Sequence, residues 1–105
     1  MSKIVLTHEK KEYELEYSRA TARTMESQGF DINEITAKPM TMIPLLFSGA
    51  FIKNHKGIKR SLIDEIFEEI GDKTSLIEAL MEMYAETLGA LTDNREGNVS
   101  WAVVK

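Results

Sequence analysis

In the stretch LLFSGAFIKNH, residues 45–55, two leucines and two phenylalanines surround a Ser-Gly-Ala step, and this concentration of apolar residues predicts the central element of the core. In a helix, four apolar residues share one side at i, i+4, i+7 and i+8, namely Ile43, Phe47, Ala50 and Phe51. Gly49 costs about 1 kcal/mol relative to alanine there, so its presence predicts close packing of another element. We predict a central helix from Met42 to about Asn54, capped by Thr41, with Pro44 in its first turn, where the missing N–H needs no partner. A helix of this length is too short to span a bilayer and too apolar to stand free.

The overall composition indicates one small globular domain. The chain has 105 residues, a net charge of -4, 43% hydrophobic residues and no cysteine, which argues against disorder, disulfides and cysteine-rich zinc sites. The N-terminus, MSKIVLTHEKKE, has no apolar run of signal-peptide length, and nowhere does the sequence hold the ~18 consecutive apolar residues of a membrane span. We therefore expect a cytoplasmic protein that is not exported.

Residues 3–17 are typical of a β-hairpin. Apolar residues alternate with polar ones at period two, namely Ile4, Leu6, Tyr13, Leu15 and Tyr17. The polar residues 8–11 form the expected turn, and Glu12, Glu14 and Glu16 should face water. Because an isolated hairpin is only marginally stable in water, helices must cover its apolar face.

The rest of the chain is predicted to be mainly helical. Ser18 and Gly29 frame a helix of about residues 19–28, and the spacing of Asp31 and Glu34 indicates one further turn of helix. Two longer amphipathic helices have serine caps at Ser61 and Ser75, each with an acid at the capping-box position. The short link at Gly71-Asp72-Lys73 predicts that these two helices form a helical hairpin.

The final residues, 93–105, allow two interpretations. A turn-rich segment, residues 93–98, precedes Val99, Trp101 and Val103, which alternate with Ser100, Ala102 and Val104. This pattern indicates either a strand added to the N-terminal hairpin or a mobile tail whose apolar side chains bind a partner. The fold class is α+β and helix-dominated: a hairpin, four to five helices and a possible short C-terminal strand, in one domain spanning 1–105.

The sequence offers no catalytic constellation. His8 and His55 lie in a polar turn and a basic loop, without a second ligand at helical metal spacing, so we expect both to be solvated. Acids along the last two helices are expected on solvated faces, namely Glu65, Glu68, Glu69, Glu78, Glu82 and Glu86. Nucleophile-elbow and phosphate-loop motifs are absent from the sequence. We expect no enzymatic activity, no metal and no cofactor.

A short basic loop is the one charge pattern that favours nucleic acid. It holds Lys53, His55, Lys56, Lys59 and Arg60 between two predicted helices. Against this alternative, the sequence pI is about 5.2, no interleaved aromatic residues offer base stacking, and acids follow at once. A solvated loop that pairs loosely with those acids is the better interpretation.

The order of these elements resembles that of a known family. A YELEYS strand is followed by helices holding RTMESQGF, LLFSGAF, SLIDEIFEEIG and LIEALMEMYAETLGAL. This order is similar to that of the small tail assembly chaperones of long-tailed (siphovirus-type) bacteriophages of Gram-positive hosts. The resemblance covers roughly residues 12–92 and lies in element order and apolar pattern rather than in an invariant signature.

The resemblance implies a non-enzymatic protein of the infected bacterial host cell. Such chaperones coat the long tape measure protein, keep it soluble and help recruit tail tube subunits, and they are often absent from the finished virion. Some self-associate, and a longer product commonly arises by ribosomal frameshifting. A structural tail or head component of the virion is the main alternative, and a small nucleic-acid-binding regulator is the other.

The composition also suggests which residues would bind such a partner. Met40, Met42, Met81 and Met83 suit either core gaps or a surface that accepts apolar helices. We predict a partner groove lined by Phe47, Phe51, Met81 and Tyr84, with Trp101 as an anchor on the tail. Burial of all five side chains within the monomer would rule this groove out.

Overall fold

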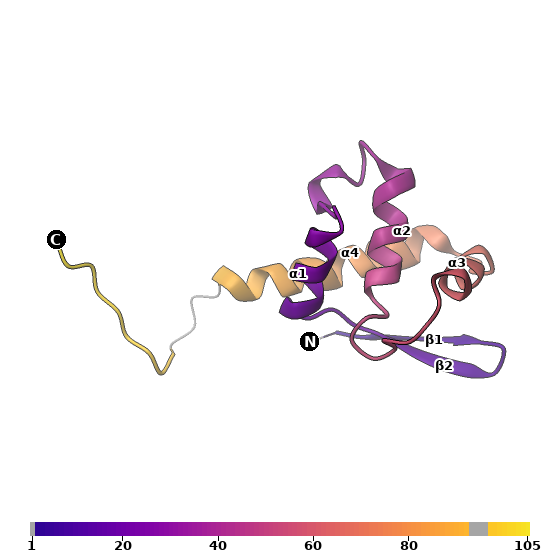
Figure 1. Ribbon diagram of the computed structural model, residues 1–105, viewed down its shortest axis with the longest axis horizontal. Coiled ribbons are helices and arrows are strands. Elements are labelled where there is room, and N and C mark those ends of the chain that lie inside the picture. The colour runs from indigo at the N-terminus through magenta and orange to yellow at the C-terminus, as the bar shows by residue number, and fades with distance from the viewer. Residues whose placement is uncertain (1, 93–96) are drawn as a thin grey trace.

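The computed structural model describes residues 2–92 and 97–105. In chain order the elements are β1 (Ile4–His8), β2 (Lys11–Leu15), α1 (Arg19–Ser27), the 3-10 helix η1 (Ile32–Glu34), α2 (Pro39–Gly49), α3 (Arg60–Glu68), α4 (Lys73–Gly89) and the 3-10 helix η2 (Ala90–Thr92). An antiparallel hairpin followed by four α-helices confirms the predicted helix-dominated α+β class (Figure 1).

The hairpin has the predicted alternation of buried and exposed residues. Tyr13 and Leu15 are buried, whereas Glu12 and Glu14 are exposed on the opposite face. The turn consists of two residues, Glu9 and Lys10, with φ angles of 50° and 68°, as a two-residue primed turn requires. The turn is therefore shorter than predicted, and the residue before it belongs to β1.

The central helix α2 both begins and ends earlier than predicted, because it ends at Gly49 rather than at about Asn54. It starts at Pro39, because proline suits the first helical position and Lys38 before it has a non-helical conformation. Thr41 is therefore not the cap, and Pro44 lies inside the helix rather than in its first turn. Neither α2 nor any other helix in the described residues is long and apolar enough to cross a membrane.

The C-terminal end of α2 is held by the hairpin and by α1. The Tyr17 hydroxyl donates a hydrogen bond of 2.6 Å to the Leu46 carbonyl, and the Glu16 N–H donates to the Ala50 carbonyl at 3.1 Å. A Cβ atom on Gly49 would lie 2.7 Å from two side-chain atoms of Met25 in α1. The predicted close approach at this glycine is confirmed.

The predicted ends of α1 are also confirmed. Ser18 and Thr21 form reciprocal side-chain to backbone hydrogen bonds at its start, and Gly29 follows its end with a φ of 99°. Asp31 caps η1 through a bond from the Asn33 N–H. These caps depend on residues adjacent in sequence, and this is why they are predictable.

The predicted caps of the last two helices are wrong. Lys59 precedes α3 without a side-chain cap, and Asp72 caps α4 by accepting a hydrogen bond from the Ser75 N–H. The two helices also do not run side by side as a helical hairpin. In Figure 1, α3 is seen nearly end-on whereas α4 lies across the view, and each packs against α2.

The core lies where α4 crosses α1 and α2 above the hairpin (Figure 1). Its fully buried side chains come from the hairpin and from all four α-helices, and from the turn after α2: Leu15, Met25, Leu46, Phe47, Phe51, Ile66, Leu80 and Tyr84. Edge-to-face aromatic pairs join these layers, such as Tyr13 with Phe51, whose ring centroids are 5.9 Å apart.

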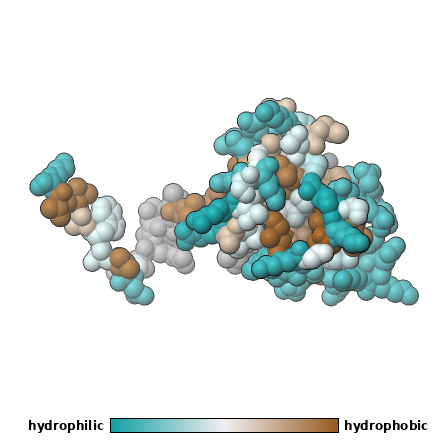
Figure 2. Space-filling view, in the orientation of Figure 1, coloured by the Kyte–Doolittle hydropathy of each residue, from teal (hydrophilic) through white to brown (hydrophobic). Residues whose placement is uncertain are grey.

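Residues 97–105 form no strand, and the sheet of the described residues contains only β1 and β2. The segment lies apart from the helical body, and its hydrophobic residues are visible as brown atoms at the far left (Figures 1 and 2). The strand interpretation of the C-terminal residues is therefore wrong for 97–105. Of the predicted turn-rich stretch 93–98, residues 93–96 lie outside the described residues.

Candidate functional site

Three of the five predicted partner-binding residues are part of the core. Phe47, Phe51 and Tyr84 are 2%, 1% and 1% exposed. Tyr13 packs against Phe51 on the hairpin side, and Tyr84 packs between other aromatic rings. Since the monomer itself covers their faces, the predicted groove does not exist in that form.

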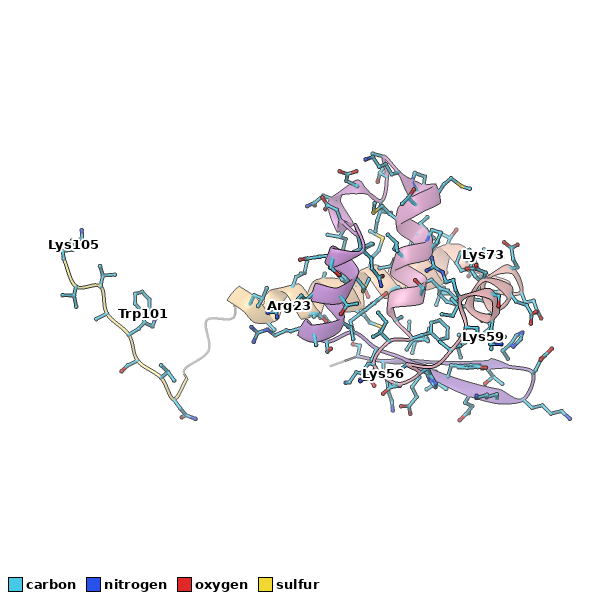
Figure 3. All side chains as sticks on the ribbon, in the orientation of Figure 1. Arg23, Lys56, Lys59, Lys73, Trp101 and Lys105 are labelled. Atoms are coloured by element: carbon cyan, nitrogen blue, oxygen red, sulfur yellow. The ribbon has the colours of Figure 1, made fainter. Side chains whose placement is uncertain are left out.

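The other two predicted residues do not join them. Met81 is half-buried against the core, and Trp101 is 83% exposed on the C-terminal segment. Figure 3 shows Trp101 far from the helical body. The five side chains therefore do not form one surface, although Trp101 keeps the exposure that an anchor needs.

An apolar groove of about 590 Å³ opens at a different place, between α2, α3 and the start of α4. Its apolar lining consists of Pro39, Met40, Ile43, Pro44, Phe47, Phe67 and Ile77, and Asp64 and Glu68 complete it. We call this set the α2–α3 groove. Met40 is 89% exposed at its edge, so folding of the monomer leaves this methionine in water.

Three of the five residues of the basic loop form hydrogen bonds or ion pairs with other residues of the chain. Lys53 pairs with Glu16 at 3.1 Å, Arg60 pairs with Asp64 at 3.6 Å, and the His55 ring accepts a hydrogen bond from the Glu14 N–H. The hydrogen bonds from Asn54 and Lys53 hold the pKa of Glu16 below its ordinary value.

The remaining basic residues, Lys56 and Lys59, are exposed near the hairpin (Figure 3). Because Lys53 and Arg60 are paired with acids of the same chain, Lys56 and Lys59 are left to form only a small positive surface. The predicted loose pairing with the acids that follow holds for Arg60, whereas Lys53 pairs with the hairpin instead.

His8 is buried rather than solvated, which corrects the sequence prediction. Its exposed fraction is 8%, and its Nε2 atom lies 3.1 Å from a carboxylate oxygen of Glu69 and 3.7 Å from one of Glu65. The hydrogen bond to Glu69 raises the pKa of His8, with smaller electrostatic contributions from Glu69, Glu9 and Glu65, although burial acts in the opposite direction. His55 is half-buried against Tyr13.

One family model matches residues 1–104 and is described as Domain of unknown function (DUF5055). The chain belongs to the DUF5055 family. Neither the curated proteins nor the solved structures include a match to it.

Sequence reasoning missed two arrangements in this DUF5055 chain. The α2–α3 groove depends on where α2 begins and on how α3 crosses it, and no local pattern reports either. Glu65 and Glu69 have i, i+4 spacing, which places them on one face of α3. That spacing indicates from sequence alone that the two carboxylates lie close together. The contact with His8 depends on the tertiary fold and cannot be predicted from the spacing.

Proposed function

We propose that this DUF5055 chain is a non-enzymatic phage tail assembly chaperone that binds the tape measure protein, keeps it soluble and helps recruit tail tube subunits. Two features support the proposal. The order of strand and helices resembles that of the tail assembly chaperones over roughly residues 12–92. The α2–α3 groove also offers an apolar surface that the monomer leaves uncovered.

The exposure of Met40 is the observation that most strongly supports the proposal. A methionine that is 89% exposed beside Ile43 and Phe67 forms an adaptable apolar surface of the kind that accepts varied helices. An unassembled tape measure protein exposes long apolar helices and needs such cover to avoid aggregation. We therefore place an apolar helix of the tape measure protein in the α2–α3 groove.

The acidic residues at the edge of the α2–α3 groove favour an occupying helix with basic residues beside its apolar stripe. Glu68 and Asp64, which pairs with Arg60, are exposed beside the apolar lining, and the chain carries a net charge of -4. An occupying helix with lysine or arginine flanking its apolar stripe would meet charges of opposite sign there. A helix with acidic flanks would be repelled.

The C-terminal segment offers a second contact. Val99, Trp101 and Val103 are 85%, 83% and 71% exposed. In an extended chain, residues two apart point to the same side, so these three side chains would present one apolar edge. Trp101 is the anchor of this edge, because tryptophan is prominent among residues that dominate binding energy.

Co-expression with the tape measure protein from the same genome tests the groove. Met40→Glu places a charge in the groove, and Leu91→Glu is the matched control, because Leu91 is also an exposed apolar residue, at 60%, and does not line the groove. We expect Met40→Glu to lower the co-purified tape measure protein about tenfold or more, the effect of losing ~1.4 kcal/mol at a hot spot. The Leu91→Glu variant should behave as wild type. Equal recovery with both variants would rule out the groove as the binding site.

Two further outcomes separate the alternatives. Mass spectrometry of purified virions that finds this chain in stoichiometric amounts would support a structural tail or head component. A DNA mobility shift that weakens steeply with salt would support a nucleic-acid-binding regulator using Lys56 and Lys59. The assembly-chaperone proposal predicts neither result.

A further inference from the structure

The contact between the hairpin tip and α3 contains three groups that bind metal ions in other proteins. His8 is the last residue of β1, Glu65 lies on α3, and Glu69, four residues later, is the C-cap of that helix. One ligand atom from each residue lies within 4.8 Å of the other two. Imidazole nitrogen with carboxylate oxygens is a donor set that suits Zn²⁺ and its neighbours in the first transition row.

The spacing of the donor atoms fits an ion of this kind. Bonds of ~2.0–2.1 Å in a tetrahedral site separate the ligand atoms by roughly 3.3–3.4 Å. The His8 Nε2 atom lies 3.1 Å from Glu69 and 3.7 Å from Glu65, so the two distances bracket that separation. A small rotation of one exposed glutamate side chain would bring both to the same value.

The charges around the three groups also favour a cation. No lysine or arginine among the described residues forms an ion pair with Glu65 or Glu69, and His8 is their one partner. Lys11, opposite His8 in the hairpin, directs its ammonium over the Tyr13 ring. Two carboxylates therefore converge on one imidazole, and even a protonated ring balances only one of them.

The two sides of the cluster differ in exposure. The His8 side chain is 7% exposed, whereas each glutamate side chain is 56% exposed. The buried imidazole fixes one ligand in place, and the open glutamate side leaves room for an ion to enter with a water molecule. Three protein ligands with one open position is a common arrangement for protein-bound zinc.

We propose that His8, Glu65 and Glu69 bind a divalent transition-metal ion of the zinc type, which fastens the tip of the hairpin to α3. The ion would replace the proton between Nε2 and Glu69 and would neutralise both carboxylates. Because it links elements 57 or more residues apart in the sequence (Glu65 and His8), binding would stabilise the folded state over the unfolded chain. This site is separate from the α2–α3 groove and does not depend on the proposed function.

Metal binding is best measured directly on the full chain after treatment with a chelator. Isothermal titration with Zn²⁺ gives affinity and stoichiometry, and Co²⁺ gives a visible absorption spectrum that reports its coordination. The test variants are Glu65→Gln and Glu69→Gln, because both side chains are exposed, and circular dichroism checks that each variant is folded. Glu68→Gln is the matched control, because Glu68 is an exposed residue of the same helix outside the cluster.

We expect one Zn²⁺ per chain, a higher thermal midpoint with Zn²⁺, and the same behaviour for Glu68→Gln. Each ligand variant should bind about tenfold more weakly or worse, since even the loss of an outer-shell partner has that effect. The proposal is overturned if wild type shows no saturable binding at millimolar Zn²⁺, or if both ligand variants bind as wild type does. Binding that survives in those variants but is lost in His55→Asn would place the ion elsewhere and also overturn it.

Discussion

The Tyr17 hydroxyl donates a hydrogen bond of 2.6 Å to the main-chain carbonyl of Leu46, and both residues are buried. Leu46 lies in the last turn of α2, where carbonyl groups lack helical partners. The residue that would bond to it in a continuing helix, Ala50, donates to Phe47 instead. Tyr17 therefore satisfies a carbonyl that the end of the helix leaves open, and burial raises the pKa of its own hydroxyl.

Tyr17→Phe should destabilise the protein by ~1–2 kcal/mol, because it leaves the Leu46 carbonyl buried without a donor. Tyr13→Phe is the matched control, since the Tyr13 side chain contacts aromatic rings and the Lys11 ammonium. Urea denaturation of the three proteins measures the difference. A loss no greater for Tyr17→Phe than for Tyr13→Phe would contradict the role of this hydrogen bond.

Gly49→Ala should cost ~1–3 kcal/mol, because its new methyl group would overlap the fully buried Met25 side chain. Gly89→Ala adds the same methyl group at the end of α4, where nothing lies within 4 Å of the Cβ position, so it should be neutral or stabilising by up to ~1 kcal/mol.

A double-mutant cycle tests the cause of the Gly49 effect. In the background of Met25→Ala, which itself costs ~2–5 kcal/mol, Gly49→Ala should cost clearly less than it does alone. Additive losses would show that the two residues do not compete for the same space.

Glu16 should make stability depend on pH in the acidic range. Its pKa is lowered below 4.5 in the folded protein by hydrogen bonds from Asn54 and Lys53. The unfolded chain therefore binds more protons in this window, so the stabilisation is present above pH 4.5 and is lost as the pH falls through the folded pKa.

The difference in urea midpoint between wild type and Glu16→Gln, measured from about pH 6 down to about pH 3, isolates this contribution. It should shrink toward low pH. Glu12→Gln is the control, because Glu12 is an exposed residue of β2, the strand that ends just before Glu16; its difference should change less with pH. A wild-type to Glu16→Gln difference that stays constant with pH would contradict the assigned pairing.

Trp101→Ala should leave the free energy of unfolding within ~0.5 kcal/mol of wild type, because Trp101 is 83% exposed and outside the helical body. The same variant should bind the tape measure protein more weakly, whereas Trp101→Phe should keep most of the affinity. Thermal melts and co-purification measure the two effects. A large loss of stability would show that the segment folds back on the body.

The features that could be predicted from the sequence are the ones that depend on neighbours along the chain. Three features could be predicted for this reason: the alternation of buried and exposed residues in β2, the cap at Ser18 and the glycine after α1. The start of α2 was not, because Lys38-Pro39 can end one helix or begin the next, and the choice depends on the packing of the helix that follows.

The site was less predictable than the fold. Aromatic content led to the prediction that Phe47 and Phe51 bind a partner, but composition cannot distinguish a core from a binding surface, and both residues are buried. Met40 is exposed because of where α2 begins, and His8 is buried because of where α3 crosses the hairpin tip. Both facts follow from the tertiary arrangement alone.

We propose that this chain keeps a tape measure protein soluble. The most direct measurement is the soluble yield of that protein, expressed from the same genome with and without this chain at matched total expression. We expect the tape measure protein to be insoluble alone and to be recovered in a soluble complex with this chain. An unchanged insoluble fraction in the presence of abundant, folded chain would contradict it.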